Sequence, residues 1–179
     1  MAQTFALQPI GRTARVTLYG LTALNIVLAV LVALTVDVAA HPLVMWFAIL
    51  STVAIAGLFA WFAMAQRHSS VTIGEHEVVV RVPLYGRSIP LSRLDAASVS
   101  KVSLPADAKF RLTWRTNGLG VPGYQLGWFK TQGAGSMLAA LSSDNAVTWQ
   151  TADAYGVLLS VADGDGFVAA LKGACARVG

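Results

Sequence analysis

The sequence predicts a two-helix transmembrane hairpin followed by a mainly β domain that a C-terminal helix closes. Three observations predict it. Residues 16–36 and 42–66 are two uncharged apolar runs, the pattern changes to alternating β-branched residues after residue 70, and apolar residues return at helical spacing after residue 166. We therefore expect three parts: an N-terminal tail at 1–15, a hairpin at 16–66 and a cytoplasmic domain at 67–179.

The hairpin follows from the length and flanks of the two runs. Each run reaches the roughly 20 residues that a helix needs to cross a bilayer. Val38-Ala39-Ala40 resembles a signal-peptide cleavage site, but the first run is longer than a typical signal and a second run follows at once. Lys and Arg flank the pair only at Arg12, Arg15 and Arg67, so we expect a plasma-membrane protein with both termini in the cytoplasm.

Small residues four apart predict the surfaces on which the two helices pack. The second run has Ala48, Thr52, Ala56 and Ala60, and the first has Asn25, Ala29 and Ala33. Asn25 is a polar residue at membrane depth. Its amide either bonds across helices or subunits, or bonds a carbonyl of its own helix. Aromatic residues mark the expected membrane boundaries, at Tyr19, Trp46, Trp61 and Phe62.

The domain reads as a series of short strands. Turn residues separate strand-like segments at 71–73, 78–82, 87–91, 97–104, 110–116, 124–131, 136–141, 147–151 and 155–160. In the segment 110–116, Phe110, Leu112 and Trp114 alternate with basic and polar residues, which predicts one buried and one basic face. Asp163 stands four residues before Phe167 and is the expected N-cap of the last helix.

No motif predicts catalysis, a cofactor or a metal. The glycines of Gly118-Leu119-Gly120-Val121-Pro122-Gly123 match a dinucleotide fingerprint, but a strand follows them instead of a helix, so a tight loop between strands explains them better. Asp163-Gly164-Asp165-Gly166 lacks the later ligands of a calcium loop. The three histidines are scattered, and the single Cys175 excludes an internal disulfide. We therefore expect that the protein is not an enzyme. We also expect no nucleic-acid partner, since no helix or run concentrates basic residues.

Basic residues give the best candidate for a binding surface. Residues 67–130 contain nine Lys and Arg against four Asp and Glu, directly after the apolar pair. The surface would comprise Lys109, Arg111 and Arg115, joined by Arg81 and Arg87. It is either a binding surface, favoured by proximity to anionic headgroups, or an ordinary solvated face of the sheet.

A distinctive segment runs from Pro122-Gly123-Tyr124 to Gly127-Trp128-Phe129, and further matching residues are Gly118, Thr151, Leu158-Leu159-Ser160 and residues 167–171. With these residues, the order of parts over residues 71–172 resembles a pleckstrin-homology (PH) domain, and more closely the bacterial PH-like proteins with N-terminal membrane spans. The segment from Pro122 to Phe129 is the most specific part of the resemblance.

This resemblance implies about seven antiparallel strands, a closing helix and a binding role. Family members often have a proline soon after the serine that matches Ser160, where this chain has Val161. The phosphoinositide pattern of eukaryotic members is absent. We therefore expect a membrane-anchored module that binds a protein, a peptide or anionic lipid headgroups. A self-associating membrane scaffold with no separate ligand is the alternative.

Overall fold

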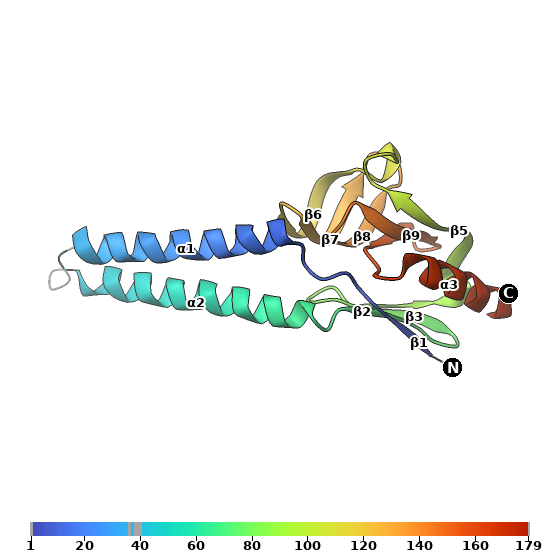
Figure 1. Cartoon of the computed structure of the whole chain (residues 1–179), viewed down its shortest axis with the longest axis horizontal. Helices are drawn as coiled ribbons and strands as arrows, with labels where there is room; N and C mark the ends of the chain where they lie inside the picture. The colour runs from blue at the N-terminus through green and yellow to red at the C-terminus, as the bar shows by residue number, and fades with distance from the viewer. Residues whose placement is uncertain (1, 36, 38–40, 179) are drawn as a thin grey trace.

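Two long antiparallel helices extend side by side from a β domain in the computed structural model, which describes residues 2–35, 37 and 41–178 (Figure 1). Helix α1 spans Arg12–Thr35 and α2 spans Pro42–Gln66. Both are long and apolar enough to cross a membrane. Helix α1 begins four residues before the apolar run, so Arg12 and Arg15 belong to its first turn. The cleavage-like residues 38–40 lie outside the described residues.

The helices pack along a line that only partly follows the expected rows of small residues. Asn25 and Ala29 are partly buried, as are Ala48, Thr52 and Ala56, but the last residue of each row, Ala33 and Ala60, is exposed. An α-helix has 3.6 residues per turn, so a strict four-residue row rotates away from its partner. The buried side of α1 instead alternates steps of four and three residues: Leu18, Thr22, Asn25, Ala29 and Val32.

The first sheet contains the strand that sequence analysis missed. Its order is β1-β2-β3-β4, formed by Gln3–Ala6, Ser70–Ile73, Glu77–Arg81 and Arg87–Pro90. The expectation of a plain tail at 1–15 is therefore wrong for β1, which pairs antiparallel with β2 from Gln3 opposite Ile73 to Ala6 opposite Ser70. Phe5 packs edge-to-face on Phe167, with ring centroids 5.4 Å apart. Residues that precede α1 and residues that follow α2 thus belong to the same sheet.

The second sheet has the order β5-β9-β10-β8-β7-β6. Its strands are Leu94–Ser103, Leu112–Val121, Tyr124–Thr131, Ser136–Leu141, Asn145–Thr151 and Tyr155–Leu159, numbered β5 to β10 in chain order. Two short 3-10 turns, η1 at Leu91–Arg93 and η2 at Ala108–Phe110, precede β5 and β6.

Strand β10 lies between β8 and β9 and runs parallel to β8. The chain must therefore cross over β10 between β8 and β9. The hydroxyl of Ser160, which is almost fully buried, accepts hydrogen bonds from the backbone N–H groups of Ser142 (3.2 Å) and Ser143 (3.3 Å) in this crossover. One serine thereby satisfies backbone donors that no strand partner satisfies.

The core lies between the two sheets and under the last helix, α3 (Gly164–Val178). Phe167, Leu171 and Ala174 of α3 are buried, and Trp149 of β9 packs on Phe167 with ring centroids 5.6 Å apart. The predicted N-cap is confirmed, because the Asp163 carboxylate accepts the Gly166 N–H at 2.9 Å. A second apolar cluster covers the other face of the second sheet, under η2.

The predicted fold class is confirmed: two apolar helices, then a β-rich domain and a closing helix. The described residues contain nine strands after the helices, compared with the about seven expected. The pairing of β8 with β10 is parallel, whereas the sequence predicted an antiparallel series. Sequence patterns locate strands but do not reveal which strand lies beside which, because side-chain alternation is the same in either pairing.

Candidate functional site

The glycine-rich segment forms a hairpin and no open loop. Strand β6 continues to Val121, so only Pro122 and Gly123 form the turn into β7. Gly118 faces Gly127 across the strand pair, and the backbones approach too closely to admit a Cβ at either position. The expectation that glycine is needed holds for these positions, while the turn itself is shorter than the glycine-rich segment 118–123.

The turn between β6 and β7 attaches the domain to the helices. A Cβ on Gly123 would lie 3.2 Å from Thr13 of α1. The buried Tyr124 packs edge-to-face on Phe62 of α2 at 5.7 Å between ring centroids, and its hydroxyl accepts a hydrogen bond from the side-chain amide of Gln66. Burial raises the pKa of Tyr124, because the charged phenolate is disfavoured away from water. Phe62, expected at the membrane boundary, is covered by the domain instead.

A cationic surface surrounds the start of β6. Arg111 lines a hollow of about 530 Å³, and Arg115 lines a neighbouring hollow of about 600 Å³; both include Leu112 and Gln125. The Lys109 ammonium lies 4.7 Å from the centre of the Phe110 ring. Lys130 of β7, which sequence analysis did not single out, is exposed and pairs in register with Trp114. We call Lys109, Arg111, Trp114, Arg115 and Lys130 the β6 surface.

Trp114 belongs to this surface and contradicts the predicted burial pattern. It was expected on the buried side of the strand with Phe110 and Leu112, yet it is 71% exposed, while Phe110 is buried and Leu112 partly buried. The register of β6 against β7 shifts between Leu112 and Trp114 and again between Arg115 and Asn117. Each irregularity interrupts the alternation of side chains, so both faces of this part of β6 meet solvent.

The other two predicted cations lie in the first sheet. Arg81 is exposed on β3. Arg87 is on β4, but its guanidinium lies 5.6 Å from the centre of the Trp128 ring in β7, and Trp128 packs edge-to-face on Tyr155 at 5.2 Å. Arg87 therefore helps to close the edge between the two sheets. Sequence spacing could not reveal that it acts across sheets.

Among the described residues, the cations of the β6 surface lack the carboxylate partners that two other cations of the domain have. Arg93 pairs with Asp153 at 2.6 Å and Lys101 with Asp165 at 2.8 Å. None of the four cations of the β6 surface forms an ion pair with a residue that the structure describes. Such a surface is suited to an anionic partner.

The remaining reactive side chains do not converge. His41, His68 and His76 are exposed. Burial raises the pKa of the Cys175 thiol, which disfavours the thiolate. Within residues 2–35, 37 and 41–178, no group of three or more His, Cys, Asp or Glu side chains could hold a metal ion.

A further hollow of about 510 Å³ lies between α1 and α2 where they meet the domain. It is lined by Leu18, Phe59 and Gln66 among others, with Arg15 and Arg67 contributing its charged residues. It was not expected from the sequence, because its walls come from segments about forty residues apart.

Comparison with known proteins assigns the family. The family model described as "Bacterial PH domain" matches residues 69–175, more than half of the chain. The chain belongs to the bacterial PH domain family. A search of curated proteins and a search of solved structures each gave no match. The match begins just after α2, so β1, which completes the first sheet of this PH domain, lies outside it.

Proposed function

We propose that this protein is a membrane-anchored PH-domain binding module whose β6 surface engages anionic lipid headgroups. Helices α1 and α2 span the plasma membrane, and both termini and the PH domain lie in the cytoplasm. PH-like domains are generally binding modules, and the exposed cations and tryptophan of the β6 surface supply a binding chemistry without a catalytic one.

The pairing of β1 with β2 supports a hairpin with both ends on one side. These strands flank the helix pair and hydrogen-bond to each other, so the segments before α1 and after α2 are joined. A chain that crossed the membrane once could not form this pairing. Arg12, Arg15 and Arg67 all lie at this end of the helices, which favours the cytoplasmic side.

The observation that carries the proposal is the composition of the β6 surface: four cations without an ion pair among the described residues, around one exposed tryptophan. Strand β6 lies on the side of the domain nearest the helices (Figure 1); the turn that contacts α1 follows the end of the strand, and the β6 surface surrounds its start. The proposal places this surface against the leaflet that the helices enter. Each Lys or Arg close to an anionic leaflet contributes about 1 kcal/mol. An exposed tryptophan such as Trp114 suits the interface, because its ring is apolar and its N–H polar.

The test measures whether Trp114 touches the membrane. The full chain is placed in nanodiscs of phosphatidylcholine, with or without phosphatidylglycerol, and quenching by acrylamide is compared between the wild type and Trp114→Phe. We expect the Trp114 emission to be protected only with phosphatidylglycerol, and protection to vanish at high salt because screening weakens exposed charge pairs.

Charge variants complete this test. The pair Arg111→Gln and Arg115→Gln should abolish protection, whereas Arg81→Gln, a cation of the other sheet, should retain it. Equal quenching of Trp114 in both lipid compositions would refute lipid contact through the β6 surface. Protection that instead appears on adding an acidic peptide would transfer the function to a protein ligand.

Self-association is a second candidate, favoured by Asn25. Its Oδ1 atom is buried in α1 and has no hydrogen-bond donor among the described residues. A buried acceptor without a donor costs about 1–3 kcal/mol, which a second copy of the chain could offset. A monomeric mass in mild detergent for the wild type would exclude it, and an oligomer that dissociates on Asn25→Leu substitution would support it.

A further inference from the structure

The hollow between α1 and α2 has one charged end and one apolar end. Its deeper walls are Leu18 and Thr22 of α1 and Ala56, Phe59 and Ala60 of α2. The two alanines leave the space open where larger residues would close it. At the domain end, Pro9 and Ile10 of the segment between β1 and α1 close the hollow. Its volume of about 510 Å³ lies within the range of small-molecule sites.

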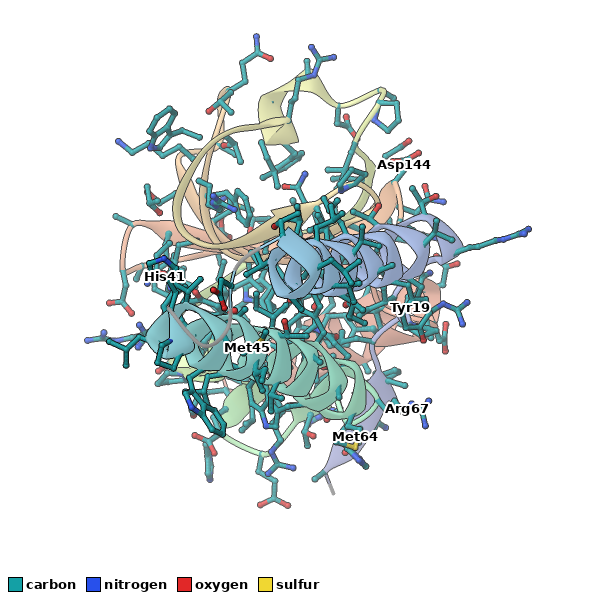
Figure 2. The ribbon with its side chains drawn as sticks, turned by 90° about the vertical axis from the view of Figure 1, so that its left-hand side faces the viewer. Tyr19, His41, Met45, Met64, Arg67 and Asp144 are labelled. Atoms are coloured by element: carbon teal, nitrogen blue, oxygen red, sulfur yellow. The ribbon has the colours of Figure 1, made fainter. Side chains whose placement is uncertain are left out.

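Arg15 and Arg67 form the charged end. Both are exposed, both line the hollow, and neither forms an ion pair with any residue in the described part of the chain. Viewed along the helices in Figure 2, Tyr19 and Arg67 lie on the same side of the pair. The lining contains no carboxylate, so no residue of the hollow balances the two guanidinium charges.

The dimensions match an amphiphile. At 1.5 Å per residue, the hollow extends about 10 Å along α1 from Arg15 to Thr22, and about 16 Å along α2 from Arg67 to Ala56. A ligand that follows it has an anionic group at the domain end and an apolar chain along the helices. Basic pockets between membrane helices at the cytoplasmic side are suited to phospholipid headgroups.

We propose that this hollow binds one anionic glycerophospholipid of the surrounding leaflet. Its phosphate lies between Arg15 and Arg67, and one acyl chain lies along Leu18, Phe59 and Ala60. This inference rests on the proposed membrane placement of α1 and α2, but it is independent of the β6 surface, which contacts headgroups without enclosing a chain.

The bound lipid would also stabilise the attachment of the PH domain. Gln66 lines the hollow and donates its hydrogen bond to Tyr124 of β7. Ile10 lines the hollow and belongs to the main core. A ligand that binds only this folded arrangement raises the unfolding temperature, and the shift grows with the logarithm of the free lipid concentration once that exceeds the Kd.

The experiment uses the full chain in neutral detergent, to which phosphatidylglycerol or phosphatidylcholine is added. Native mass spectrometry counts the lipids retained, and thermal unfolding gives the accompanying shift. We expect one phosphatidylglycerol to be retained in preference to phosphatidylcholine. The double variant Arg15→Gln, Arg67→Gln should weaken retention about 30-fold, or roughly fivefold per arginine. Arg12→Gln, a neighbouring arginine outside the hollow, is the matched control.

A steric pair tests the apolar part. Ala60→Phe fills the hollow from an exposed position and should abolish retention, whereas Ala54→Phe, exposed elsewhere on α2, should not. Equal retention of the two lipids, or retention that survives Ala60→Phe, would overturn the proposal. Release of the protein from membranes by alkaline carbonate would refute the membrane placement itself. Retention of one phosphatidylglycerol by the Arg111→Gln, Arg115→Gln variant would support the hollow as the site, because that variant changes only the β6 surface.

Discussion

Replacing Gly127 by alanine should destabilise the PH domain more than replacing a glycine whose only constraint is its positive φ. Gly127 has φ +119° and lies opposite Gly118 in the pairing of β6 with β7. A Cβ at Gly127 would lie 2.6 Å from the Gly118 Cα and would also collide with the Asn117 carbonyl oxygen. Both are backbone atoms, so relief requires the two strands to separate.

The expected magnitude has two parts. The positive φ costs an alanine about 1–2 kcal/mol, and forcing a methyl group into close-packed backbone adds about 1–3 kcal/mol. The total of about 2–5 kcal/mol corresponds to a fall of about 4–20 °C in unfolding temperature for a chain of this size. That is a large share of the roughly 5–15 kcal/mol that stabilise a typical folded domain.

Gly135→Ala provides the matched control. Gly135 has φ +78°, and a Cβ there would meet nothing within 4 Å, so the control incurs the conformational cost alone. Thermal unfolding of the full chain in detergent, followed by tryptophan fluorescence, measures both variants. An unfolding temperature for Gly127→Ala within about 2 °C of the control would refute the steric reasoning, because the added clash alone predicts at least that difference.

Three further predictions follow from single contacts. Tyr124→Phe removes the acceptor for the Gln66 amide and should cost about 1–3 kcal/mol of unfolding free energy. Burial raises the Tyr124 pKa above its unfolded value of about 10, so the native state holds its proton longer and stability should fall as pH rises above about 10. A pH series should show a smaller alkaline fall in Tyr124→Phe, and an unchanged fall would contradict this cause. Ser160→Ala leaves backbone donors of the crossover at 142–144 unsatisfied and should cost about 1–3 kcal/mol of unfolding free energy. Denaturant unfolding measures this loss. A loss below about 0.5 kcal/mol would mean that water replaces the hydroxyl. Phe5 is partly buried, so Phe5→Ala should cost less than the about 3–5 kcal/mol lost at a fully buried phenylalanine but should still lower the unfolding temperature if β1 is integral to the domain. An unchanged unfolding temperature would show β1 to be dispensable.

Local patterns in the sequence predicted much of the fold but less of the site. Strand segments, the apolar helices and the Asp163 cap each follow from periodicity or a capping residue within a few positions. Arg111 and Arg115 were found by composition, and the structure places them at neighbouring hollows. The exposure of Trp114 was missed, because two register shifts in β6 interrupt the alternation on which its burial was predicted.

The sequence by itself determined the parts of this protein and their order, because hydrophobic periodicity and length are properties of contiguous residues. Only the tertiary structure decided how distant parts meet. It paired β1 with β2, although both helices lie between these strands in the sequence. It also inserted β10 between β8 and β9, and it formed a hollow that both Arg15 and Arg67 line. These arrangements depend on which surfaces bury each other, and contacts between segments far apart in the chain leave no periodic trace in either segment.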